Sequence, residues 1–104
     1  MRIKYIVNKD PRVREFNTLI KNQFPQILTE KKPELFLVAG GDGAMLHAIH
    51  NTIDKHIPYL GKALGNFNFL MNNFDDDIST ITSLLNDSIK ISTFSTNAIK
   101  AYLN

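Results

Sequence analysis

Residues 35–47 decide the fold of this chain, and they read LFLVAGGDGAMLH. Leu35 to Ala39 form an uninterrupted apolar run, which is typical of a strand covered on both faces in a parallel sheet. A glycine loop follows at Gly40, Gly41 and Gly43, where the backbone can take positive φ and a ligand can come close to the main chain. The apolar residues after the loop recur at helical spacing, at Met45, Leu46, Ile49 and Ile53. A strand, a glycine loop and a helix are therefore expected in direct succession, with the helix N-terminus open to an anion such as phosphate.

The composition is that of one small globular domain. The chain has 104 residues, 43% of them hydrophobic and 21% charged, and a net charge of +2. The longest basic run is Lys31-Lys32, so nucleic-acid and membrane-surface binding gain no support from composition. The sequence contains no cysteine, which excludes disulfides and thiolate chemistry and is compatible with the reducing cytoplasm. No segment approaches the roughly 20 apolar residues of a membrane span, and the N-terminal stretch is too short and too charged for a signal peptide. We expect a soluble cytoplasmic domain.

Before residue 35, the sequence predicts a strand at residues 3–7 and a helix that begins after Asp10. Asp10 is a favoured cap, and Pro11 suits the first helical position because its missing N–H costs nothing there. Apolar residues then follow helical spacing, at Val13, Phe16, Leu19, Ile20 and Phe24. Pro25 closes this helix, and residues 26–30 are interpreted as a short strand.

After the glycine loop, the helix is expected to run to about Asp54. Residues 57–60 are expected to form a strand, with Pro58 restricted to the beginning of the strand. Residues 61–72 mix loop formers with apolar groups, which indicates an ordered loop pressed on the core. Another helix follows Asp75-Asp76-Asp77, with one face lined by Ile78, Ile81, Leu84 and Leu85. Residues 88–94 look like a half-exposed strand. Alternating strands and helices predict a three-layer α/β fold with a mostly parallel, Rossmann-like sheet, whose ligands bind at the carboxyl ends of the strands.

Two common phosphate-binding motifs do not fit the loop. The dinucleotide fingerprint G-x-G-x-x-G fails because Leu46 stands at its third glycine, and the expected acid about 20 residues later is missing. The P-loop fails because Gly61-Lys62 is followed by Ala63 and lacks a correctly spaced glycine before it. What remains is a single acid, Asp42, among three glycines. It could accept a proton from an alcohol that attacks a phosphoryl group, or it could simply cap the helix.

Residues 37–46, LVAGGDGAML, resemble the glycine-rich motif of the NAD kinases, which phosphorylate the 2′-hydroxyl of NAD with ATP or polyphosphate. A second match follows at the family's separation: Pro58-Tyr59-Leu60-Gly61, then Gly65, then Phe69-Leu70. The resemblance covers about residues 3–94 and corresponds to the family's N-terminal α/β domain. Residues 1–104 are accordingly expected to form one nucleotide-binding domain.

The resemblance implies roles for particular residues. Asp42 would be the general base, with Gly40, Gly41, Gly43 and Ala44 holding the nucleotide and Mg²⁺ accompanying the ATP. His47 would contact the nucleotide, the alternative being a solvated side chain on the first helical turn. Phe69 would pack near a ribose. No metal site is expected: His47 and His50 lack a third ligand, and the acids at residues 75–77 are explained by the helix dipole.

The sequence also departs from the family. Ala44 stands where Thr is usual, Ala63 replaces an Asn, and Asn68 replaces a Gly. The family's second, all-β domain, which carries an Asn-Glu pair for the adenosine, is not found in these 104 residues. The resemblance therefore implies an NAD kinase that is weak or inactive as this chain alone, needing a complementing β domain or self-association. A non-catalytic nucleotide-binding or assembly module is the alternative. A lipid kinase shares Gly-Gly-Asp-Gly but normally has Glu where His47 stands, and ranks last.

Overall fold

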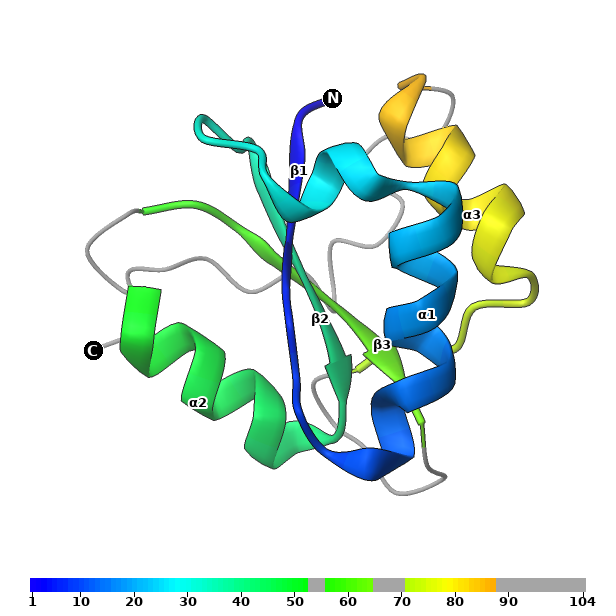
Figure 1. Cartoon of the computed structure of the whole chain (residues 1–104). Coiled ribbons are helices and arrows are strands. Elements are labelled where there is room, and N and C mark those ends of the chain that lie inside the picture. The colour runs from blue at the N-terminus through cyan, green and yellow to red at the C-terminus, as the bar shows by residue number, and fades with distance from the viewer. Residues whose placement is uncertain (53–55, 65–70, 88–104) are drawn as a thin grey trace.

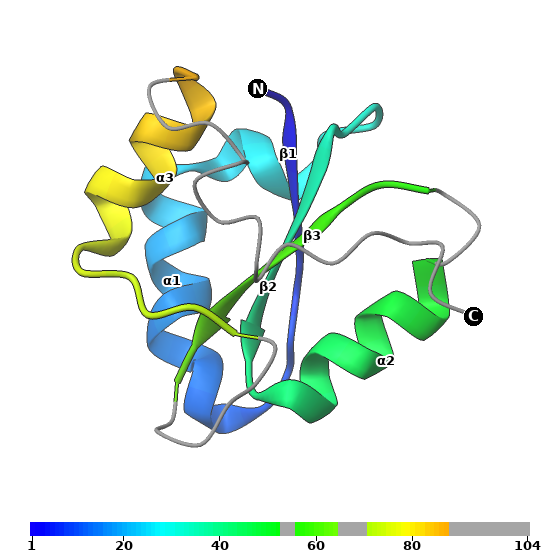
Figure 2. The ribbon, with the colours of Figure 1, turned by 180° about the vertical axis from the view of Figure 1, so that it is seen from behind.

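A computed structural model describes residues 1–52, 56–64 and 71–87, which form a parallel sheet between two layers of helices (Figure 1). The elements are β1 (Ile3–Ile6), η1 (Pro11–Val13), α1 (Arg14–Gln23), η2 (Pro25–Leu28), β2 (Leu35–Gly40), α2 (Asp42–Thr52), β3 (Tyr59–Ala63) and α3 (Asp77–Leu85). The strands lie in the order β1-β2-β3, and both pairs are parallel. Figure 1 and Figure 2 show α1 and α3 on one face of the sheet and α2 on the other. The predicted three-layer α/β fold is confirmed.

The central strand β2 is buried along its whole length. Side chains alternate between the two faces of a strand, and Leu35, Leu37 and Ala39 accordingly join the core under α1 and α3. Phe36 and Val38 point to the opposite core under α2. The uninterrupted apolar run is thus explained by the need to fill two cores from one strand.

Each face of the sheet has its own hydrophobic core. The larger one packs α1, η2 and α3 against the sheet through Ile3, Tyr5, Val13, Phe16, Ile20, Phe24, Ile27, Leu35, Leu37, Ala39, Leu60, Ile81 and Leu84. The smaller one packs α2 through Phe36, Val38, Met45, Ala48, Ile49, Tyr59, Ala63 and Met71. In the smaller core, the rings of Phe36 and Tyr59 stack with their centroids 5.3 Å apart.

The segment after β1 begins as the sequence predicts. Asp10 caps η1 by accepting the Arg12 N–H at 2.9 Å, and Pro11 occupies the first helical position. The Arg12 guanidinium also bonds the Asp10 carboxylate, through Nη2 at 2.6 Å and Nε at 3.1 Å. These hydrogen bonds from the Arg12 side chain, and then the one from its backbone, lower the pKa of Asp10 from 3.8 to about 2.

The short strand expected at residues 26–30 is wrong. Pro25 starts the 3₁₀ helix η2 instead, and the Ile27 N–H donates to the Phe24 carbonyl at 3.1 Å. Pro25 favours this turn because its fixed φ suits the first position of a helix. Ile27 and Phe24 are both buried in the larger core, so one tight turn satisfies both side chains.

The strand near Pro58 lies slightly later than predicted, at Tyr59–Ala63. Pro58 sits at its entry, where its carbonyl accepts the Phe36 N–H at 3.0 Å and no N–H is required of it. Asn72 pairs with the edge of β3 that does not face β2. The Ala63 N–H donates to the Asn72 carbonyl, and the Asn72 N–H donates to the Gly61 carbonyl, each at 2.8 Å.

Two helical faces differ in detail from the expected ones. In α2, Met45 and Ile49 are buried, but Leu46 is 58% exposed. In α3, Ile81 and Leu84 are buried, whereas Ile78 is 42% exposed. In α2 the residues packed against the sheet are Met45, Ala48 and Ile49, and Leu46 lies outside this stripe. Of the loop expected at residues 61–72, residues 61–63 belong instead to β3. The expected strand at residues 88–94, residues 65–70 of that loop, and Ile53 and Asp54 at the end of the predicted helix lie outside the described residues.

Gly61→Ala should destabilise the fold. A Cβ at Gly61 would lie 2.3 Å from Met71 Sδ and 2.9 Å from Met45 Cε. Both contacts are to the flexible ends of methionine side chains, but these side chains are buried, so any adjustment must be made within the smaller core. We expect the free energy of unfolding to fall by about 1–3 kcal/mol, as is usual for overpacking, measured by urea denaturation. An unchanged midpoint would show that the methionines repack without cost.

Asp10→Asn should change how the thermal stability of the chain depends on pH below about pH 4. The pKa of Asp10 is lowered in the folded chain to about 2, so its ionised form stabilises the fold above about pH 4, and this contribution is lost as the pH falls toward 2. We expect the difference in thermal midpoint between the unmodified chain and Asp10→Asn to be constant above about pH 4 and to shrink below it. Circular dichroism melts across this range measure the difference. A difference independent of pH would contradict the assignment.

Candidate functional site

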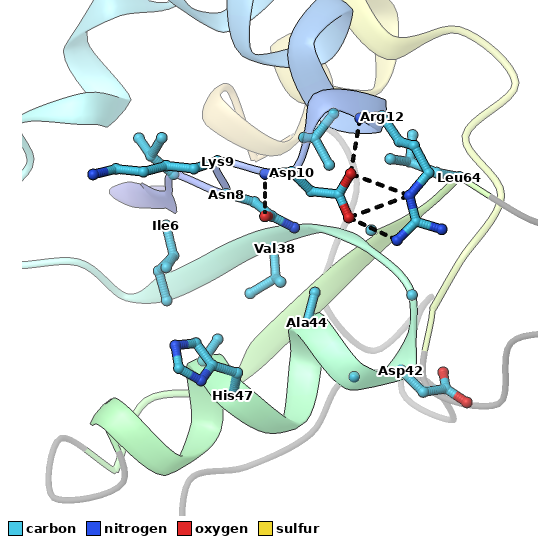
Figure 3. Close-up of a pocket in the computed structure, with 16 residues that line it drawn as sticks. Ile6, Asn8, Lys9, Asp10, Arg12, Val38, Asp42, Ala44, His47 and Leu64 are labelled. Carbon is cyan, nitrogen blue, oxygen red and sulfur yellow. Dashed lines mark hydrogen bonds and ion pairs between the residues drawn. The ribbon is translucent and has the colours of Figure 1, made fainter.

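A cleft of about 950 Å³ opens at the carboxyl ends of β1 and β2 (Figure 3). One wall is the segment that leaves β1, the opposite wall is α2, and the end of β2 lies between them. The lining residues are Ile6, Val7, Asn8, Lys9, Asp10, Arg12, Val13, Val38, Gly40, Gly41, Asp42, Gly43, Ala44, His47, Ala48 and Leu64. This is the edge at which parallel α/β sheets bind ligands.

The glycines of the loop serve different purposes. Gly40 has φ +134°, and a Cβ there would lie 2.9 Å from Ala44 Cβ and 3.1 Å from Asn8 Nδ2. Gly40 is therefore required by the backbone turn and by close packing. Gly43 is exposed, and a Cβ there would meet no atom within 4 Å. Packing within the described residues does not require Gly43 to be glycine.

Asp42 is the first residue of α2 and lines the cleft. The Gly41 carbonyl accepts the Met45 N–H at 3.2 Å, so Gly41 holds the capping position and Asp42 follows it. The hypothesis that the Asp42 side chain caps the helix stays a prediction. An acid in the first turn still interacts favourably with the helix dipole. Figure 3 shows the Asp42 carboxylate at the glycine-loop end of the cleft, pointing away from Ala44 and His47.

His47 lies one turn further along α2, on the wall of the cleft. Its side chain is exposed, and its Nε2 lies 3.1 Å from Asn51 Nδ2. This contact ties the His47 ring to the next turn of α2. His50, by contrast, does not line the cleft. No group of three or more His, Cys, Asp or Glu side chains suited to a metal occurs within the described parts of the chain.

A polar network that the sequence analysis missed braces the wall after β1. Asn8 Nδ2 donates to the Ala39 carbonyl at 3.1 Å, and Asn8 Oδ1 accepts the Asp10 N–H at 3.0 Å. Asn17 Nδ2 on α1 donates to the Asn8 carbonyl at 2.7 Å, and the Tyr5 hydroxyl donates to Asn17 Oδ1. Burial raises the pKa of Tyr5, so its hydroxyl keeps its proton. The position of Asn8, directly after a predicted strand at the binding edge of the sheet, was the available signal.

The rim of this wall carries the pair Asp10–Arg12, which the sequence analysis treated only as a helix start. Both residues line the cleft, and the Arg12 side chain is 84% exposed. Hydrogen bonds to Asp10 raise the pKa of the Arg12 guanidinium, which keeps its charge at every relevant pH.

The predicted site residues are thus largely brought together. One cleft is lined by Gly40, Gly41, Asp42, Gly43, Ala44 and His47. Phe69, together with Gly65 and Leu70 of the second motif, lies outside the described residues. Gly61 of that motif is explained by packing against Met71 and Met45, without reference to a ligand.

Comparison with known proteins gives a consistent result. The profile of the ATP-NAD kinase N-terminal domain matches residues 7–93. The NAD kinase of Rickettsia canadensis (strain McKiel) is 39% identical over 74 residues, which are 71% of this chain and 29% of that protein. The NAD kinase of Rickettsia akari (strain Hartford) is 49% identical over 45 residues, or 43% of this chain and 18% of that protein. The NAD kinase of Rickettsia bellii (strain OSU 85-389) is 48% identical over 42 residues, or 40% and 16%.

The matched part of the chain thus spans less than a third of the length of these relatives. The family match nevertheless covers most of this sequence, including β2, the glycine loop and α2. The chain therefore belongs to the NAD kinase family and corresponds to its N-terminal domain.

Proposed function

We propose that this chain binds NAD and ATP and contributes the acid that activates NAD for phosphorylation. The observation that carries the proposal is the cleft itself, which places Asp42 and the glycine loop at the carboxyl ends of the central strands. The family membership supplies the reaction, which transfers the γ-phosphoryl group of ATP to the 2′-hydroxyl of NAD.

In this proposal, Asp42 accepts the proton of the 2′-hydroxyl as its oxygen attacks the γ-phosphorus, and the bond from that phosphorus to ADP breaks. The products are NADP and ADP, and the proton stays on the Asp42 carboxyl until solvent removes it. The start of α2 supplies backbone N–H groups and a positive dipole end for the phosphates. Mg²⁺ enters with ATP as part of the substrate.

Gly43 and His47 complete the proposed binding surface. Gly43 offers an unobstructed backbone at the second position of α2, where a phosphate or ribose can come close. His47 would contact the nucleotide at the other end of the cleft, beside Ile6 (Figure 3). Ala44, between them, presents a small side chain that leaves the cleft open.

A non-catalytic nucleotide-binding or assembly module is the second candidate. One observation favours it: the Asp42 carboxylate points away from the part of the cleft formed by Ala44 and His47 (Figure 3). As a base, Asp42 would need a hydroxyl presented at the glycine-loop end. The named relatives are NAD kinases, so a lipid kinase has no comparable support.

Further parts of the proposal follow from the family. Residues 1–104 would act as one nucleotide-binding domain, with the rest of the substrate pocket supplied by a complementing β domain or by self-association. Polyphosphate as an alternative phosphoryl donor, and a cytoplasmic location, remain predictions.

Asp42→Asn tests the catalytic role. If Asp42 is the base, NADP formation from NAD and Mg²⁺–ATP should fall by about 10²–10⁴-fold, the usual contribution of general base catalysis. The assay uses the full chain with any complementing β domain that it requires. Asp75→Asn, a change at an exposed acid outside the cleft, is the matched control and should keep its activity. Retained turnover in Asp42→Asn would favour the non-catalytic module.

Gly43→Ala tests whether the nucleotide comes close to the main chain at Gly43, without disturbing the fold. A methyl group at Gly43 meets open space, and alanine is preferred to glycine in a helix by roughly 0.5–1 kcal/mol. We expect an unchanged or higher urea midpoint together with at least a tenfold loss in kcat/KM. A variant that is stable and fully active would show that the nucleotide does not approach the main chain at this position.

A further inference from the structure

Arg12 is the cation on the wall opposite the start of α2. Asp10 engages its Nε at 3.1 Å and its Nη2 at 2.6 Å. A guanidinium has five N–H donors in a rigid plane, so this bidentate pair fixes the plane and leaves the Nη1 edge available to a ligand. Arg12 lines the cleft with its side chain 84% exposed, and Figure 3 draws its guanidinium toward the same end as Asp42.

The charges around the cleft make Arg12 important for a polyanion. The cleft is lined by two cations, Lys9 and Arg12, and by two acids, Asp10 and Asp42, so their formal charges cancel. Figure 3 shows the Lys9 side chain extending away from Asp10 and Arg12. Near the glycine loop, Arg12 is therefore the cation that the described walls present to a phosphate chain.

We propose that Arg12 contacts the phosphate chain of the bound nucleotide, which lies between its guanidinium and the N-terminus of α2. Asp10 holds the guanidinium in place and is not itself a ligand. This assignment rests on the proposed function, and it names the wall after β1, in addition to the glycine loop, as part of the phosphate site. It also orients the nucleotide, with the phosphates at the Arg12 end and an organic ring toward the end formed by Ile6 and His47.

The test is calorimetric titration of the full chain, with any complementing β domain that it requires, with Mg²⁺–ATP and, separately, with adenosine. Arg12→Gln should weaken ATP binding by about tenfold to a hundredfold, the usual effect of losing one charge-assisted hydrogen bond, and should leave adenosine binding unchanged. Arg12→Lys, which keeps the charge but not the planar donor set, should be intermediate. Lys9→Gln is the matched control, since it makes the same change of charge on the same wall of the cleft and should weaken ATP binding much less.

Equal losses for ATP and adenosine, equal losses in Arg12→Gln and Lys9→Gln, or no measurable ATP binding by the unmodified chain would each overturn the assignment. Circular dichroism establishes that the variants are folded, which is expected because glutamine retains the backbone N–H that Asp10 caps. The titration involves no phosphoryl transfer. A selective loss of ATP binding in Arg12→Gln would therefore stand even if Asp42→Asn retained its activity, and the reverse result would leave the proposed reaction untouched.

Discussion

The structure depends on the burial of β2 on both faces. A strand of six buried residues must be covered by helices on both sides, and the parallel pairing with β1 and β3 requires crossover connections that supply them. The same pairing directs the carboxyl ends of β1 and β2 to one edge of the sheet. The cleft is therefore a consequence of the packing constraint, and the residues that follow each strand become its walls.

Much of this could be predicted from the sequence because the decisive signals are local. The apolar run at residues 35–39, the Asp10-Pro11 helix start and the glycine loop each need only neighbouring residues for their interpretation. The 3₁₀ helix η2 was missed because the five residues at 26–30 are too few for their periodicity to distinguish a strand from a tight turn. The exposed Leu46 was misjudged because the angle at which α2 meets the sheet is set by tertiary packing.

In the site, too, the features that depend on neighbouring residues could be predicted, and those that depend on tertiary contacts could not. The predicted residues of the glycine loop lie together because they are adjacent in sequence, whereas Asn8 and Arg12 come to the cleft from a separate segment. Their roles depend on contacts with Ala39 and Asp10 that no spacing rule indicates. The loop glycines also look alike in sequence, yet Gly40 is required by its backbone conformation, whereas a Cβ at Gly43 would meet no atom of the described residues within 4 Å.

The bonds that join Tyr5, Asn17, Asn8 and Ala39 have a thermodynamic consequence for recognition. They order the wall after β1 when the chain folds, so the conformational entropy of that wall is lost before any ligand arrives. An incoming molecule then meets a preorganised surface, and the free energy of binding does not include the cost of ordering that wall. Because this wall is anchored to α1 through Asn17 and to β2 through Ala39, we expect it to keep its position when a ligand enters the cleft.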